Sequence, residues 1–142
     1  MNYSTTVSIL KERPENNSVI NVAENHDSRQ LDYIFIPDNH EYIKVRHRDI
    51  LYVEADGSYV KIFTDLKVYQ ISTNLKHFNE QFHHPDFIRI SRKHVVNINY
   101  TERINGICLI IKNNAGEEQK LPFSKRKRQD ILKALPVIKI KH

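Results

Sequence analysis

The apolar residues of this chain are gathered in short runs, and this spacing constrains the fold more than any other feature. From residue 33 onward, runs of four to six residues rich in Val, Ile, Tyr and Phe alternate with turn-forming Asp, Asn, Gly and Pro. Runs of this length and composition are typical of β-strands. We therefore expect a mainly β, antiparallel architecture with two or three short helices.

The residues between these runs predict hairpins. Two runs meet at Asp56-Gly57-Ser58, which favours a tight turn because Gly adopts positive φ without steric cost. Pro37-Asp38-Asn39 is a turn signal that ends an earlier run. The expected strands are residues 33–36, 41–45, 50–55, 59–64, 67–71, 87–90, 95–99, 107–112 and 118–123.

Helical spacing replaces the strand pattern twice. Ser72 or Thr73 is placed to cap a short helix whose apolar residues recur at i, i+3 and i+7, namely Leu75, Phe78 and Phe82. Ser124 is placed to cap a last helix that ends at Pro136 and carries the apolar residues Ile131, Leu132 and Leu135. Both helices are short, so the domain remains mainly β.

We expect one domain flanked by two tails. Residues 1–30 hold scattered apolar residues without a sustained period, which bury too little surface to offset their ordering entropy, so we expect a disordered tail or linker. Residues 31–136 form the expected domain, and residues 137–142 a C-terminal tail. The first 15 residues lack the apolar stretch of a signal peptide, and no apolar run is long enough to span a membrane. We therefore expect a cytoplasmic protein without membrane association.

The sequence contains few of the residue patterns that are typical of enzymes. With 3 Gly the chain has no glycine-rich phosphate loop, and its single Cys108, expected to be a buried small hydrophobe, excludes an internal disulfide or a multi-cysteine zinc site. The 8 His show no metal-ligand spacing. Glu54 and Asp56 would face one side of a strand, as paired acids do, but beside a hairpin turn this is more typical of a polar strand edge. We expect no enzyme, catalytic residue, cofactor or metal site.

The net charge of +5 is unevenly distributed. Residues 1–88 hold 9 basic and 13 acidic side chains, whereas residues 89–142 hold 13 basic and 4 acidic ones. Positive charge gathered in one part of a chain is typical of a protein with a polyanionic partner. A solvated surface that is merely basic is the alternative.

Two turns in the basic part break a local rule. Lys125–Arg128 would occupy the first turn of the helix capped by Ser124, where the helix macrodipole disfavours cations. Ser91 would cap a single helical turn that begins with residues 92–94. An external anion would compensate for the clustered charge, so both turns are candidate phosphate sites. The alternative is an exposed basic turn that salt screens.

Four segments resemble the motifs of LytTR DNA-binding domains in order and spacing. Residues 50–62 (ILYVEADGSYVKI) are similar to the hairpin of that family, residues 74–78 (NLKHF) to its amphipathic helix, residues 87–97 (FIRISRKHVVN) to its most specific block, and residues 121–126 (LPFSKR) to its closing motif. The resemblance covers about residues 33–135. It implies small antiparallel β-sheets stacked in an elongated sandwich, and a bacterial response regulator output domain that binds promoter DNA and regulates transcription.

The resemblance also implies which residues contact double-stranded DNA. The contacts of the family come from loops on one edge that enter successive major grooves, and by position they fall at Ser58, Tyr59, Arg92, Lys93, Lys125 and Arg126. Arg92 would read a base in one groove, and Lys125 or Arg126 would act in the next. Lys93, Lys127 and Arg128 would neutralise phosphates.

The chain departs from the family pattern at two of these positions. Arg92-Lys93-His94 stands where the family commonly has Arg-Ser followed by an apolar or aromatic residue, so the base preference can differ. Lys125 stands where Arg is usual, and because Lys acts as a point charge it is better suited to a phosphate than to a base. Asn97 matches a position that we expect to be structural, since a buried polar group needs partners.

Two other interpretations stay open. A protein-interaction module would use the same basic edge to dock an acidic partner. Single-stranded RNA binding would need aromatic stacking platforms, and Tyr59 and Phe63 lie apart from the basic turns. The predicted tail at residues 1–30 is too short to hold a phosphoacceptor receiver, so a sensor or regulatory protein would be a separate chain, and tandem half-sites would suggest a dimer on DNA.

Overall fold

The computed structural model describes residues 31–140, of which those from Tyr33 onward belong to one compact unit. The predicted tail at residues 1–30 and residues 141–142 lie outside the described residues, so the domain boundaries stay predictions. In chain order the elements are β1 (Tyr33–Asp38), β2 (Glu41–Arg46), η2 (His47–Asp49), β3 (Ile50–Asp56), β4 (Tyr59–Thr64), β5 (Val68–Ile71), α2 (Leu75–Gln81), β6 (Phe87–Arg89), β7 (His94–Asn97), η3 (Ile98–Tyr100), β8 (Thr101–Asn105), β9 (Cys108–Lys112), β10 (Glu118–Pro122), η4 (Lys125–Lys127) and α3 (Arg128–Ala134).

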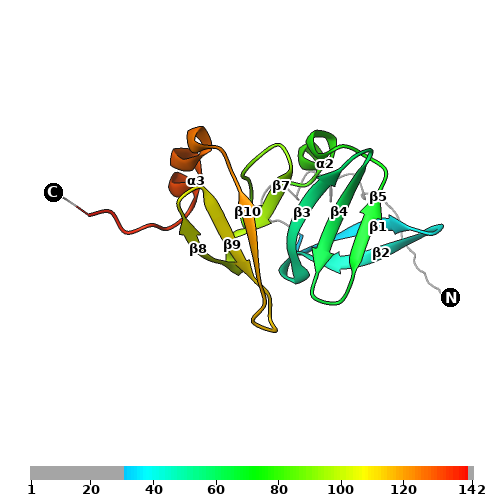
Figure 1. Cartoon of the computed structure of the whole chain (residues 1–142). Coiled ribbons are helices and arrows are strands. Elements are labelled where there is room, and N and C mark those ends of the chain that lie inside the picture. The colour runs from blue at the N-terminus through cyan, green and yellow to red at the C-terminus, as the bar shows by residue number, and fades with distance from the viewer. Residues whose placement is uncertain (1–30, 141–142) are drawn as a thin grey trace, which may run out of the picture. The chain divides into compact units, whose positions relative to one another are not determined.

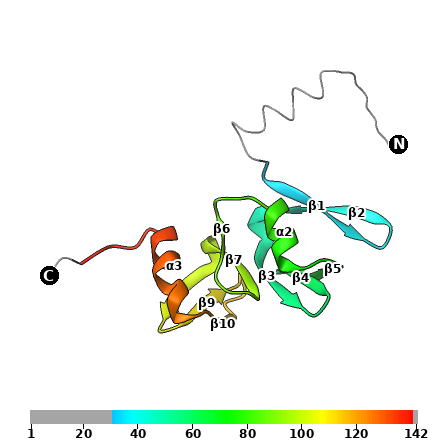
Figure 2. The same cartoon turned by 90° about the horizontal axis from the view of Figure 1, so that it is seen from above.

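Within the described residues the strands form small antiparallel sheets, as predicted (Figure 1). β1 and β2 form a two-stranded sheet, and a five-stranded sheet has the order β5-β4-β3-β7-β6. A three-stranded sheet has the order β10-β9-β8. Seen from above, α2 and the β1–β2 hairpin lie to one side of β3, and the three-stranded sheet with α3 lies to the other (Figure 2).

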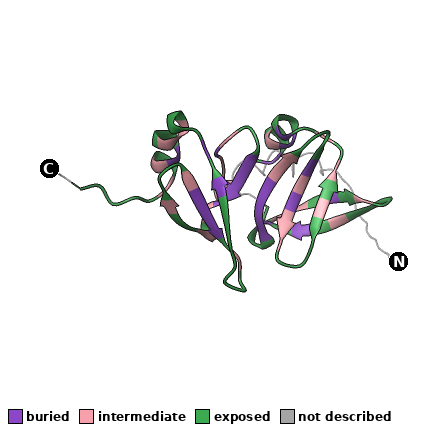
Figure 3. Cartoon of the chain, viewed as in Figure 1, coloured by how far each residue is buried: buried purple, intermediate pink, exposed green. Residues whose placement is uncertain are grey.

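The central strands β3 and β7 are buried on both faces (Figure 3). Val53 and Val95 enter a first core with side chains from β1, β2, β4 and α2. Tyr52 and Val96 enter a second core with side chains from β9, β10 and α3. The two-sided burial explains why these strands read as continuous apolar runs rather than as an alternation of apolar and polar residues.

The predicted hairpins are present. Asp56 pairs with Tyr59 around Gly57, whose φ is +61°. The β1–β2 turn uses residues 39–40, which both have positive φ, as a type I′ turn requires. β1 runs through Pro37 instead of ending before it, because an edge strand tolerates a residue that lacks an N–H donor.

Three local expectations were wrong. Strand β8 was not expected because its sequence, Thr-Glu-Arg-Ile-Asn, has a single apolar residue. Pairing with β9 and the Arg103–Glu118 ion pair at 2.8 Å hold it in place.

The N-cap of α2 is Asn74, whose Oδ1 accepts from the N–H of His77 at 2.7 Å, and neither Ser72 nor Thr73 caps the helix. Cys108 is only half-buried, because it lies at the start of β9 beside a hairpin turn.

The apolar residues predicted for this helix are buried, Leu75 and Phe78 within α2 and Phe82 at its C-cap. The last helix differs in detail, because α3 begins at Arg128 after the η4 turn and the Ser124 hydroxyl makes no capping hydrogen bond. No helix in the part of the chain described by the structure is long and apolar enough to cross a bilayer.

Asn97 is structural, as predicted, and joins three segments. Its side chain is 1% exposed. The Nδ2 donates to the carbonyl oxygens of Ile50 at 2.9 Å and His47 at 3.4 Å, and the Oδ1 accepts from the N–H of Asn99 at 2.9 Å. The amide therefore fixes the end of β7 to the start of β3 and to the η3 turn.

We predict that Asn97→Ala lowers the free energy of unfolding by about 1–3 kcal/mol, because it leaves the buried Ile50 carbonyl without this partner. Urea denaturation followed by circular dichroism measures the change. Asn99→Ala is the control, since the Asn99 side chain is exposed and its backbone N–H is retained. Equal losses in the two variants would contradict a role for the buried amide.

Candidate nucleic-acid interface

The Ser91–Lys93 loop joins β6 to β7 and is braced by its own residues. Ser91 Oγ accepts hydrogen bonds from the N–H groups of Lys93 (3.1 Å) and His94 (3.2 Å). Arg89 donates through Nε to the Ser91 carbonyl at 3.0 Å and through Nη2 to the Arg92 carbonyl at 3.2 Å. The predicted helical turn is therefore wrong, because the Ser91 hydroxyl closes a bend and not a turn of helix.

The loop presents Arg92 and Lys93 to solvent. Both side chains are exposed, and neither makes a hydrogen bond or ion pair within residues 31–140. The Lys93 carbonyl accepts from the N–H of Ala55 at 2.8 Å, which ties the loop to β3. Two cations are thus carried on a backbone whose position is set by the sheet.

His94 was expected among the cations of this turn, and that expectation was wrong. It is the first residue of β7, it is buried, and its Nε2 lies 2.8 Å from Oε1 of Glu54 on β3. Its Nδ1 is buried without a hydrogen-bond partner among the described residues. We assign the proton to Nε2, since an N–H at Nδ1 would be an unsatisfied buried donor.

The Glu54 carboxylate also acts on Tyr52, which precedes it on the same face of β3. Burial, assisted by the nearby carboxylate, raises the pKa of Tyr52 to about 12. Tyr52 and His94 are edge-on, with ring centroids 6.0 Å apart. Glu54 is therefore the hydrogen-bond partner of buried His94 and lies near the phenol of Tyr52.

Asp56 instead pairs with Lys61 at 2.9 Å across the β3–β4 hairpin. The hydrogen bond from Lys61 lowers the pKa of Asp56 and raises the pKa of Lys61. Ser58 in the turn is exposed, and Tyr59 at the start of β4 is 45% exposed. The hairpin therefore offers a hydroxyl and a phenol at its tip beside a neutralised ion pair.

The second cation-rich turn is η4, held in place by the buried residues on either side of it. Phe123 and Ile131 lie in the second core, and the N–H of Phe123 donates to the Ile107 carbonyl at 2.8 Å. Lys125 and Arg126 are exposed, and Lys127 is half-buried. The charges are thus presented by a 3-10 turn and not, as predicted, by the first turn of the α-helix.

Arg128 was predicted as a phosphate contact, and its guanidinium also has a partner within the domain. Its Nε donates to the Gly106 carbonyl at 3.2 Å, in the turn between β8 and β9. Its role toward DNA stays a prediction.

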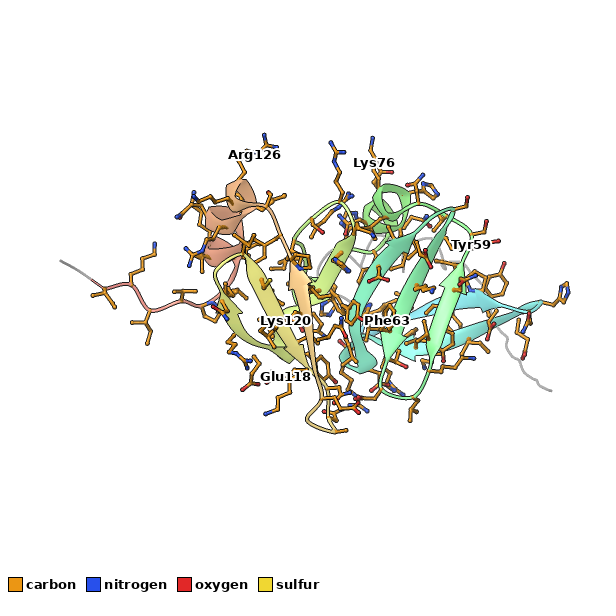
Figure 4. The ribbon with its side chains drawn as sticks, viewed as in Figure 1. Tyr59, Phe63, Lys76, Glu118, Lys120 and Arg126 are labelled. Carbon is orange, nitrogen blue, oxygen red and sulfur yellow. The ribbon has the colours of Figure 1, made fainter. Side chains whose placement is uncertain are left out.

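Both cation-rich turns lie along one edge of the domain together with α2 and the β3–β4 hairpin (Figure 1). Figure 4 shows the side chains of Arg126 and Lys76 projecting from this edge in the same direction. Lys76 is an exposed cation of α2 that was not among the predicted DNA contacts. Its exposure could have been predicted, because helical periodicity turns a residue between the apolar Leu75 and Phe78 away from the core.

Comparison with known proteins identifies the family of this chain. The sequence model of the LytTr DNA-binding domain family matches residues 40–136. The chain belongs to the LytTR DNA-binding domain family. A search of curated proteins finds no match. The fold is similar to a solved LytTr DNA-binding domain of a protein described as a methyl-accepting/DNA response regulator from Bacillus cereus, with a TM-score of 0.60 and 19% sequence identity over 75% of this chain and 99% of that chain.

Membership of the LytTR family establishes the general role of the chain. It carries a DNA-binding domain of the kind that acts in transcription regulation and resembles the output domains of response regulators. The matched residues include the β3–β4 hairpin, the Ser91–Lys93 loop and the η4 turn. Strand β1 precedes the matched residues.

We predict that Glu54→Ala lowers the free energy of unfolding by about 1–3 kcal/mol, because the buried imidazole of His94 then has no partner at either nitrogen. The free energy of unfolding should fall less in Glu54→Gln, since the amide oxygen of Gln still accepts a hydrogen bond from Nε2 of His94. Thermal and urea unfolding of both variants measure the difference. If Gln were as harmful as Ala, the charge of Glu54 and not its acceptor oxygen would support the loop.

Proposed function

We propose that this LytTR domain is a sequence-specific regulator that binds double-stranded promoter DNA and reads successive major grooves through loops on one edge. The observation that carries this proposal is the Ser91–Lys93 loop, which is braced by four hydrogen bonds from Ser91 and Arg89 and leaves Arg92 exposed. A guanidinium carried on a braced loop backbone is suited to read guanine, because its two parallel donors match O6 and N7.

Arg126 is the second base-reading residue in this proposal. It lies in η4, on the same edge as the Ser91–Lys93 loop, and its planar fork suits a base better than the ammonium group of its neighbour Lys125. Lys125 then contacts phosphate. Ser58 and Tyr59 contribute hydrogen bonds or packing from the β3–β4 hairpin at the end of the edge.

The phosphate contacts in this proposal come from the remaining cations. Lys93, Lys127 and Arg128 lie within or next to the two cation-rich turns, and Lys76 adds a charge from α2. These residues fix the domain on the duplex without selecting a sequence, because phosphates are alike at every base pair. Their electrostatic contribution weakens with salt as counterions are released less favourably.

We predict that Arg92→Ala weakens binding to the preferred site by about 1–3 kcal/mol and relaxes selection at one position of that site. Selection from a random pool of duplex DNA gives the site and its base preferences for each variant. Lys120→Ala is the matched control, because Lys120 is an exposed cation of β10 that lies away from the edge with the two cation-rich turns (Figure 4). A uniform loss of affinity for all sequences would contradict base reading by Arg92.

We predict that Lys127→Ala weakens binding to all duplex sequences alike. It should reduce the slope of log affinity against log salt concentration by about one, because one fewer phosphate is neutralised. Fluorescence anisotropy at four salt concentrations, on preferred and scrambled duplexes, measures both effects. A changed base preference with an unchanged salt slope would assign Lys127 to a base instead.

A further inference from the structure

The outer face of the β1–β2 hairpin has an unusual composition. The register places Tyr33 opposite Arg46, Phe35 opposite Lys44, and Pro37 opposite Tyr42. Side chains alternate across a strand, and the intervening residues Ile34, Ile36, Ile43 and Val45 face the first core. The six outward residues, Tyr33, Phe35, Pro37, Tyr42, Lys44 and Arg46, are called here the outer hairpin face.

The fold does not require apolar side chains on this face. Ile36 and Val45 are buried and already anchor the hairpin to the first core. A sheet with one face in solvent is normally polar on that face. The outer hairpin face instead exposes 56% of Phe35 and 74% of Tyr42. Exposed apolar groups that gather in this way mark interaction surfaces.

All charged residues of the outer hairpin face are cations. Lys44 and Arg46 are exposed, with Lys44 Nζ lying 4.2 Å from the centroid of the Tyr33 ring. The two carboxylates of the hairpin alternate to its other side, and Asp38 there pairs with Lys67 at 3.2 Å. An acidic group on a partner would therefore meet two cations and no carboxylate among these six residues.

The hairpin lies at the end of the domain away from α3 in both cartoon views (Figures 1 and 2). The first of its two strands precedes residue 40, where the match to the LytTR family begins. Strand β2 lies within the matched residues, but none of the predicted DNA contacts lies on the outer hairpin face.

We propose that the outer hairpin face docks an acidic, partly apolar segment of a partner protein. Tyr and Arg are the residue types that most often dominate the energy of protein interfaces, and the exposed rings supply apolar contact for such a segment. Within residues 31–140, β2 forms a strand ladder only with β1, and in this proposal the partner segment pairs its backbone with the second edge of β2. A nucleic acid strand would use the rings and cations but has no backbone donors for that edge.

The proposal is tested on the full chain with a phage-displayed library of random 12-residue peptides. Selected peptides should be rich in Asp and Glu and should contain aromatic or aliphatic residues. A selected peptide should bind the double variant Lys44→Glu/Arg46→Glu at least tenfold more weakly than the original chain. Phe35→Ser/Tyr42→Ser should weaken it similarly, and because both residues are exposed this variant should keep its circular dichroism spectrum and unfolding transition.

Lys125→Glu/Arg126→Glu is the matched control, because it reverses the same number of charges on the DNA edge. It should retain peptide binding and lose duplex DNA binding, whereas Lys44→Glu/Arg46→Glu should do the opposite. Peptides that depend on Lys125 and Arg126 would overturn the proposal, since acidic segments would then simply occupy the DNA edge. Binding of a twelve-nucleotide oligo-dT that is abolished by Lys44→Glu/Arg46→Glu, without any peptide binding, would overturn it in favour of a nucleic acid platform.

Discussion

The domain is organised around two neighbouring strands, β3 and β7, whose residues are buried on both faces. A strand buried on both faces must be covered from two sides. The β1–β2 hairpin and α2 close the first core, while the three-stranded sheet and α3 close the second. The Asn97 amide joins the end of β7 to the start of β3 by hydrogen bonds to two backbone carbonyls and one N–H. The fold thus depends on one strand pair more than on any single turn or helix.

This arrangement determines where the residues of the proposed interface lie. β3 and β7 are antiparallel, and Glu54 is paired with His94 in the register. The chain therefore leaves β3 toward Gly57 and enters β7 from Lys93 at the same end of the sheet, which brings the hairpin tip and the Ser91–Lys93 loop to one edge. The Glu54–His94 hydrogen bond and the bond from Ala55 N–H to the Lys93 carbonyl join the two there. Because the loops are set by a buried strand pair, the proposed binding of DNA through them would cost less conformational entropy.

Local patterns were sufficient for the strands, the hairpins and the apolar face of α2, because each is encoded within a few residues. They were not sufficient for features that depend on distant partners. His94 stands in a run of cations, which indicates exposure, yet it is buried against Glu54, forty positions away in the chain. Strand β8 is polar along its length and exists because β9 lies beside it. The exposed cations of the two turns were identified correctly as a charged group, but the local geometry beneath them was not.

That geometry changes the physical account of the basic segment. In the Ser91–Lys93 loop the N–H groups of Lys93 and His94 are already bonded to the Ser91 hydroxyl, so an anion at this loop would meet its side chains. The arginines of the basic segment divide into two kinds. Arg89 and Arg128 donate hydrogen bonds to carbonyls of loops and turns and so help to fix the backbone there. Arg92 and Arg126 lie beside these bracing residues and are exposed. The excess charge in the last third of the chain is therefore not one undivided patch, since Arg89 and Arg128 donate to backbone carbonyls and Arg92 and Arg126 make no such bond among the described residues.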